Sequence, residues 1–314
     1  MLPVQVVTGS VVVGCDGSWH SEQAVRVATM EARRRGAGLV LLAVAEVERN
    51  VPDRLQWLAQ ATEDAVEGAK AVAERALTHV VELAPTQPTQ VVIATDFAAP
   101  EVAATGRVAS LLVLGRHGLH GQLAFSLGST SAELARRFAC PVLIGRDQSS
   151  LDEPGRGAEP PVVLVGLDAG KDCARVLRVA ADEAAVRGAR LVAVHALNAS
   201  PAHTNVALAV GWRRVHDAMR SAGLPVGVPS RLVITRDDPV TALLLRARPQ
   251  DLLVVGTRGG GRLAGLVQGS VSRAVLDAMP CDVLVVPQPR PGQPGNQSNP
   301  GDLALAGTDA AQRP

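Results

Sequence analysis

The sequence has few aromatic residues: three Phe, three Trp and no Tyr among 314 residues. Its core must therefore be built from Val, Leu and Ala, and little ring surface remains for stacking the bases of a nucleic acid. The net charge is also small, +1 from 31 basic and 30 acidic side chains. Because no overall field favours a polyanion, we expect neither a nucleic acid nor a membrane as partner.

Cysteine motifs and long apolar runs are absent too. The four cysteines have no CxxC spacing, and no charged-then-apolar secretory segment opens the chain, so we expect reduced thiols and a cytoplasmic protein. They are Cys15, Cys140, Cys173 and Cys281. The longest apolar runs, such as residues 39–47, are shorter than the roughly 20 residues of a membrane-spanning helix. These runs are typical of buried strands.

The chain contains a duplicated unit. A shift of 152 residues superposes RVATMEARRRGAGLV on RVAADEAAVRGARLV, and a shift of 141 superposes LLVLGRHG on LLVVGTRG and LGSTS on QGSVS. The second copy has therefore lost 11 residues, where copy one has a long polar helix. We expect copy one over residues 1–146, a linker over 147–161, copy two over 162–287 and a disordered tail over 288–314.

Each copy alternates strands and helices. In copy one we expect helices over residues 53–83, 100–108 and 129–137, each preceded by a short apolar strand. Buried strands that alternate with helices predict an α/β fold of two tandem doubly wound parallel-sheet domains. The run Arg33 to Arg35 precedes Gly36 and fits the last turn of a helix, where cations complement the dipole.

A glycine-rich loop follows the fourth strand of each copy. Glycines let the backbone turn sharply and expose its N–H groups, and the first amides of the next helix are unpaired, so the two together can hold a phosphate. Glycines that merely allow a tight turn are the alternative, but the spacing recurs in both copies. The residues are Gly115, Gly118, Gly128 and Ser129 in copy one, and Gly256, Gly259, Gly269 and Ser270 in copy two.

Both loops fit G-x2-G-x9-G-(S/T), and GCDGS follows the first strand. With these motifs the chain resembles the universal stress protein family in its tandem form, over residues 11–146 and 162–287. The resemblance implies Rossmann-like, adenine nucleotide alpha hydrolase-like domains that bind ATP at the strand ends, and it leaves open whether Mg²⁺ accompanies the phosphates. Asp16 and Asp168 would lie at the adenine end, Gly14 and Gly166 would leave space for the nucleotide, and the loop residues would surround ribose and phosphates. An aspartate after a strand also commonly caps the next helix, and capping is compatible with binding.

Copy two departs from the motif at two places. It has DAG at residues 168–170 where copy one has DGS, which removes the helix-capping Ser18, and PCD at 280–282 where copy one has CPV. We rate the first site above the second, although Arg262 in the second loop could contact a phosphate. The fifth strands are apolar and invite pairing, as the resemblance also implies. They predict an intramolecular pseudo-dimer and leave a homodimer through edge strands open.

Catalytic motifs are missing: there is no GxSxG, HExxH or GxxxxGK[ST]. His117 and His120 lie three residues apart in the first loop, but copy two does not keep them, so a metal site is disfavoured. His195 fits a packed side chain, and Asp237 with Asp238 fits a turn before Pro239.

Three functions remain. The leading one is an ATP-binding regulatory protein of stress response or dormancy with an unknown protein partner. The alternatives are a slow ATPase and a structural module that binds no nucleotide. A β-branched residue at Gly115 or Gly256 should abolish occupancy of its own site and leave the fold largely intact.

Overall fold

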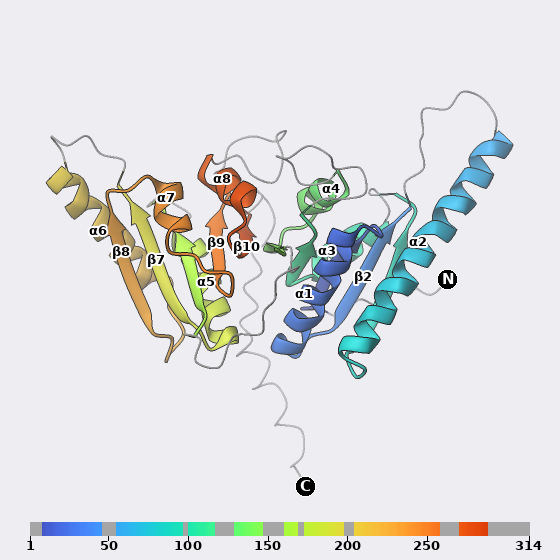
Figure 1. Cartoon of the computed structure of the whole chain (residues 1–314), viewed down its shortest axis with the longest axis horizontal. Helices are drawn as coiled ribbons and strands as arrows, with labels where there is room; N and C mark the ends of the chain where they lie inside the picture. Colours follow the sequence, from blue (N-terminus) through green and yellow to red (C-terminus); the bar gives the residue numbers. More distant parts are fainter. Residues whose placement is uncertain are drawn as a thin grey trace, which may run out of the picture.

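The structure is a computed structural model that describes residues 8–45, 55–96, 100–116, 129–146, 160–168, 173–197, 204–257 and 270–287. The expected linker, apart from residues 160 and 161, and the expected disordered tail lie outside this part of the chain. Strands and helices alternate in both copies, as the apolar pattern predicts (Figure 1).

The elements of copy one are β1 (Val11–Cys15), α1 (Trp19–Arg35), β2 (Leu39–Val44), α2 (Leu55–Leu83), β3 (Thr89–Ala94), α3 (Pro100–Val108), β4 (Leu111–Leu114), α4 (Ser129–Arg137) and β5 (Val142–Ile144). Those of copy two are β6 (Val162–Gly166), α5 (Cys173–Arg187), β7 (Arg190–Ala196), α6 (Thr204–Ser221), β8 (Ser230–Thr235), α7 (Pro239–Leu244), β9 (Leu252–Gly256), α8 (Ser270–Ala278) and β10 (Asp282–Val286). The predicted bounds of α3 and α4 are confirmed, and α2 begins two residues later than predicted.

One ten-stranded sheet runs through both copies, in the order β3-β2-β1-β4-β5-β10-β9-β6-β7-β8. Neighbouring strands within a copy are parallel, which confirms the predicted doubly wound α/β fold. Among the strands of the described residues, only β5 and β10 pair antiparallel, with Leu143 opposite Leu284. The strands of the two copies therefore run in opposite directions where β5 meets β10.

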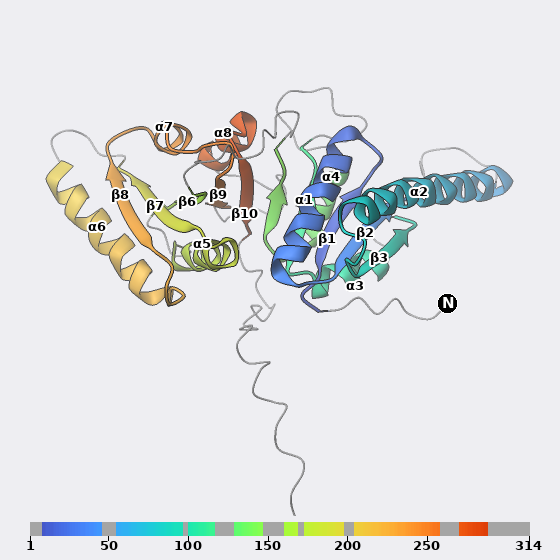
Figure 2. The same ribbon diagram turned by 60° about the horizontal axis from the view of Figure 1, so that its bottom comes forward.

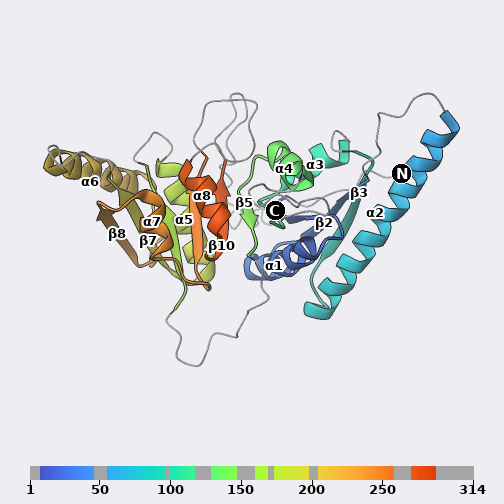
Figure 3. The ribbon, with the colours of Figure 1, turned by 45° about the horizontal axis from the view of Figure 1, so that its top comes forward.

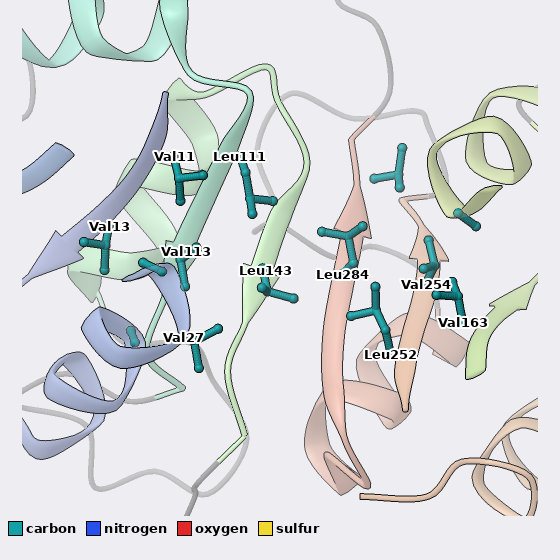
Figure 4. Close-up of a cluster of buried hydrophobic side chains, with 14 of the residues drawn as sticks. Val11, Val13, Val27, Leu111, Val113, Leu143, Val163, Leu252, Val254 and Leu284 are labelled. Atoms are coloured by element: carbon teal, nitrogen blue, oxygen red, sulfur yellow. The ribbon is translucent and has the colours of Figure 1, made fainter. Parts of the chain in front are cut away.

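Helices cover both faces of the sheet. Alternate strand residues point to opposite faces, so Val11 and Val13 pack in one apolar cluster and Val12 in another. Helices α1, α2, α5 and α6 cover the first face of the sheet, and α3, α4, α7 and α8 cover the second. Figure 4 shows that the first cluster continues from Leu143 to Leu284 across the middle of the sheet.

The second helix accounts for the length difference between the copies. Helix α2 has 29 residues and α6 has 18, a difference of 11, which is the number that the two sequence shifts predict. These helices lie at the two outer ends of the molecule (Figure 3). Among the described residues, no helix combines the length and apolarity that crossing a membrane requires.

The predicted intramolecular pairing of the fifth strands is present. We call the boundary between β5 and β10 the seam. Polar contacts extend it: the Arg146 N–H after β5 donates to Asp282 Oδ1 at 2.8 Å, and the Arg146 guanidinium donates to the Pro280 carbonyl at 3.2 Å. The departure PCD in copy two thus supplies a seam contact that CPV in copy one cannot.

A homodimer through edge strands stays a prediction, but within this sheet the fifth strands are not edge strands. Strand β5 already has β4 and β10 as neighbours, and β10 has β9 and β5, so neither strand offers an open edge. The outer strands are β3 and β8. Association of two chains by any other surface stays a prediction.

Candidate nucleotide site

The order of the strands places a crevice in each copy. In copy one, β1 lies beside β4, and the chain continues from β1 to β2 on one side and from β4 to β5 on the other. This is a topological switch point, and ligands of open α/β sheets bind there, beyond the carboxyl ends of the strands. Copy two repeats the arrangement with β6 beside β9. We call the ends of β1 and β4 candidate site one, and those of β6 and β9 candidate site two.

A small hollow lies at candidate site one. As lined by the described residues, it has essentially no volume that a water-sized molecule could occupy, whereas typical ligand pockets enclose roughly 300–1,000 Å³. Residues 117–128, which connect β4 to α4, lie outside the described residues and are not counted in the lining of the hollow. Its lining is Gly14, Asp16, Ser21, Leu114, Gly115, Ser131 and Leu134.

A hydrogen-bonded turn joins β1 to α1 at this hollow. Ser18 is the N-cap of α1, as predicted, and its Oγ accepts the Ser21 N–H at 3.1 Å. Asp16 Oδ1 accepts the Ser18 N–H at 2.9 Å, and the Asp16 N–H donates to Ser21 Oγ at 3.3 Å. The half-buried Asp16 therefore fixes the turn before the helix, whereas Ser18 does the capping.

Candidate site two is built with different side chains. Asp168, the counterpart of Asp16, is exposed, and residues 169–172 after it lie outside the described residues. Cys173 opens α5 at the position that Ser21 occupies in copy one. The site thus keeps its carboxylate but has a thiol where copy one has a hydroxyl.

The loop glycines fill crowded positions. A Cβ atom at Gly115 would lie 2.7 Å from the backbone carbon and oxygen of His20, and one at Gly256 would lie 2.8 Å from Cγ2 of Val176. The expectation that a β-branched residue leaves the fold largely intact is therefore wrong at Gly115, where the backbone of α1 would have to move; at Gly256 it requires the buried Val176 side chain to shift. These glycines let α1 and α5 approach β4 and β9 closely.

Gly14 and Gly166 also face protein atoms. A Cβ at Gly14 would lie 2.8 Å from Leu134 Cδ1 and 3.0 Å from Leu114 Cδ2, and one at Gly166 would lie 3.0 Å from Leu243 Cδ1. Their packing role is the close approach of α4 and α7 to the first strand of each copy. A nucleotide contact at these two glycines stays a prediction.

Two serines that the motif did not single out hold the ends of the loops together. Ser131 Oγ donates to the Gly115 carbonyl at 3.3 Å, and Ser272 Oγ donates to the Gly256 carbonyl at 2.9 Å. Both side chains are buried, and each lies in the first turn of its helix. Their signal in the sequence is the fourth position of GSTS and GSVS, which aligns in the two copies.

The remaining predicted site residues are placed only in part. Ser129 and Ser270 are the first residues of α4 and α8, as predicted, and Ser270 is exposed. Each of these helices has nine residues. The first N–H groups of a helix have no acceptor within the helix, so they can donate to an anion. Gly118, Gly128, Gly259, Arg262 and Gly269, together with His117 and His120, lie outside the described residues.

The described residues hold no constellation typical of catalysis. They contain no group of three or more His, Cys, Asp or Glu side chains able to hold a metal ion. Burial raises the pKa of the Cys15 and Cys140 thiols to about 12, which suits packed thiols and not nucleophiles. The ring of the buried His195 contacts the Leu167 carbonyl at 2.8 Å, which agrees with the predicted packed side chain. Asp238, for which the sequence predicted only a turn before Pro239, is the N-cap of α7.

Comparison with known proteins identifies the family. The universal stress protein family profile matches residues 8–146 and 161–287, both copies. The chain belongs to the universal stress protein family. It is 31% identical over 303 residues to universal stress protein Rv2005c of Mycobacterium tuberculosis, an alignment that covers 88% of this chain and 97% of the relative.

Solved universal stress proteins share the fold. One from Archaeoglobus fulgidus, 18% identical, superposes with a TM-score of 0.62 over 89% of this chain and 98% of its own. Two further members were crystallised with nucleotides. One is in complex with cAMP (31% identical, 40% of this chain and 95% of its own, TM-score 0.29), and one from A. fulgidus is in complex with dAMP (16% identical, 44% and 98%, TM-score 0.28). Their low TM-scores add nothing to the argument on fold.

Proposed function

We propose that the protein binds ATP at both candidate sites and acts as a regulatory protein of stress response or dormancy, in which occupancy changes its conformation or its choice of protein partner. One observation carries the proposal: the same strand ends, glycine and helix start recur at the switch point of both copies. This recurrence supports a retained ligand site more strongly than a single tight turn would.

The two sides of candidate site one suit different parts of ATP. Helix α4 starts with unpaired amides and the positive end of its dipole, which favour the phosphates. Asp16 lies on the other side, after β1, where the family resemblance puts the adenine. We assign Mg²⁺ no ligand among the described residues, and a role as companion of the phosphates stays part of the proposal.

Regulation is favoured over hydrolysis by the absence of a base in the described part of the hollow's lining. Of its seven residues, Asp16 alone is ionisable, and its carboxylate accepts the Ser18 N–H. General-base catalysis needs a group within reach of the attacking water. Hydrolysis at more than a trace rate is therefore not expected.

Nucleotide stoichiometry tests the proposal. Purified protein is titrated with Mg·ATP by calorimetry, and nucleotide released from denatured protein is measured by chromatography. We expect two sites in the wild type, one in Asp16→Ala, one in Asp168→Ala and none in the double variant. Asp182→Asn, which removes an exposed carboxylate on α5, is the matched control and should keep both sites.

Two further measurements separate the alternatives. Phosphate release from ATP above the background of the double variant would favour the slow ATPase. A wild type that binds no adenine nucleotide and carries none after purification would contradict the proposal and leave the structural module. Inorganic triphosphate as a competitor shows whether the phosphates alone supply the affinity.

A further inference from the structure

Helices α1 and α5 lie next to each other across the seam (Figure 2). Four buried charged side chains meet between them. We call Glu31, Arg35, Glu183 and Arg187 the charge cluster. Across the seam, Arg35 donates to both carboxylate oxygens of Glu183 at 2.8 and 2.9 Å, and Arg187 donates to Glu31 at 2.8 Å. Within the copies, Arg35 lies 2.9 Å from Glu31, and Arg187 pairs with Glu183.

The charge cluster is symmetric and shielded from water. Glu183 and Arg187 follow Glu31 and Arg35 by 152 residues, the spacing of the repeat, so each copy supplies one carboxylate and one guanidinium group. The exposed fractions of the four side chains lie between 5% and 13%. Every carboxylate therefore contacts an arginine of its own copy and one of the other copy.

Such a cluster tolerates little displacement. Charges that have left water are stable only while their partners stay within hydrogen-bonding distance, and salt screens them far less than charges on the surface. A shift of α1 along its axis would separate Arg35 from Glu183 and Glu31 from Arg187 together. The charge cluster thus holds the ends of α1 and α5 to each other.

The opposite ends of both helices begin at the candidate sites. Helix α1 begins directly after its N-cap, Ser18, whose N–H donates to Asp16. The third residue of α1, Ser21, lines the hollow. Helix α5 starts at Cys173, five residues after Asp168. Each helix therefore runs from one candidate site to the charge cluster, over 17 residues in α1 and 15 in α5.

We propose that the charge cluster couples the two nucleotide sites, so that filling one site changes the ATP affinity of the other through α1 and α5. Small shifts of helices at an interface are an established means of such coupling. The inference rests on the proposed function, because it concerns regulation of the same two sites. It assigns the buried charges a regulatory role besides their role in holding the copies together.

Calorimetry with Mg·ATP tests the coupling. Asp168→Ala and Asp16→Ala report the affinity of each site while the other is empty, and the two stepwise constants of the wild type report both together. We expect the stepwise constants to differ from the single-site values by at least about fivefold. In Glu183→Gln the stepwise constants should be those that two independent sites with the single-site values would give, because the link between α1 and α5 is broken.

Asp182→Asn is the matched control. It changes a neighbouring carboxylate on the same helix, whose partner Arg178 is 3.1 Å away on the exposed surface, and it should keep the wild-type coupling. Arg35→Lys keeps the positive charge but loses the two-oxygen contact with Glu183, so it should weaken the coupling and serves if Glu183→Gln fails to fold.

Hydrogen exchange supplies a readout with the charge cluster intact. In Asp168→Ala, ATP can fill only candidate site one, and we expect it to change amide exchange in the last turn of α5, in the other copy. Unchanged exchange there, or coupling in Glu183→Gln and Arg35→Lys equal to the wild type, would overturn the inference but not the proposed function. A wild type that binds no ATP would overturn both.

Discussion

Copy one and copy two build the same strand ends with different neighbours. In both, the serine in the first turn of the fourth helix bonds to the carbonyl of the loop glycine. The aspartates after the first strand of each copy differ in their surroundings. Asp16 is half-buried and accepts a hydrogen bond from the Ser18 N–H, whereas Asp168 is exposed. The comparison teaches that the repeat preserves the glycine and helix start and varies the side of the site where the base is proposed to bind.

At the seam, some contacts are the same in both copies and others are not. The two copies contribute equally to the charge cluster, but only copy one makes the following contact next to its candidate site. Arg116, directly after Gly115, donates to the Asp277 carbonyl at the end of α8 at 2.6 Å, whereas its counterpart Thr257 donates to Val286 within copy two. The residue after the loop glycine therefore contacts copy two at candidate site one, whereas the corresponding residue at candidate site two contacts its own copy.

Substitutions in the charge cluster should have the largest effect on stability. Glu31→Gln and Glu183→Gln each leave buried guanidinium groups without a full partner, which costs about 3–5 kcal/mol. Glu31→Gln should cost the more of the two, because Arg34 also pairs with Glu31. Urea unfolding measures both, and a loss below about 1 kcal/mol in either variant would contradict the burial of these charges.

Sequence and structure agree on the elements because their signals are local. Ser18 and Gly36 mark the two ends of α1 through caps that involve only neighbouring residues, and both fall where predicted. The run Arg33 to Arg35 does lie in the last turn of α1. Its bonds to Glu183 were not predictable, because they depend on the antiparallel register of β5 and β10, which places residues 148 positions apart in contact.

The candidate site was predictable to a similar extent. Spacing and repetition identified Gly115, and the family resemblance pointed to Asp16; the structure brings both together in one hollow. The sequence did not predict the packing of Gly14 against Leu134. Leu134 lies in α4, about 120 residues later in the chain, and the order of the strands in the sheet brings α4 close to β1. Local motifs identify which residues lie at a strand end, whereas the atoms they face depend on the whole fold.

The loop glycines offer a direct test of the difference between the copies. Gly115→Ala would place its Cβ against the His20 backbone, which cannot move without α1, and should cost about 2–3 kcal/mol. Gly256→Ala meets a Val176 side chain that can adjust, and should cost about 1 kcal/mol. Thermal and urea unfolding of the two variants measure this, and equal losses would show that the neighbours do not differ in rigidity.

The two loop-closing serines should have smaller effects. Ser131→Ala and Ser272→Ala each remove a bond to a glycine carbonyl, at a cost of about 1 kcal/mol. The Ser272 bond is the shorter, 2.9 against 3.3 Å, so Ser272→Ala should be the more destabilising. The same urea series measures both, with Ser221→Ala, an exposed helical serine, as the control. The reverse order would mean that burial of the hydroxyl outweighs the length of its bond.

The smallest expected effect concerns Asp282, whose counterpart in copy one under the shift of 141 residues is Pro141. Burial raises the pKa of the Asp282 carboxyl, Glu31 raises it further, and the Arg146 N–H and the guanidinium groups of Arg187 and Arg146 oppose the rise. The folded protein therefore binds this proton more tightly than the unfolded chain. The stability that this provides is fully present below the ordinary pKa and is lost as the pH rises through the raised value.

Asp282→Asn should remove that pH dependence while its amide oxygen still accepts the Arg146 N–H. The stability of the variant relative to the wild type should therefore increase as the pH rises from the ordinary aspartate pKa, about 3.9, through the raised value, and then become constant. Urea unfolding of both proteins between about pH 4 and 7 measures the difference. A difference that falls with rising pH would show that Arg146 and Arg187 stabilise the charged carboxylate more than its burial penalises it.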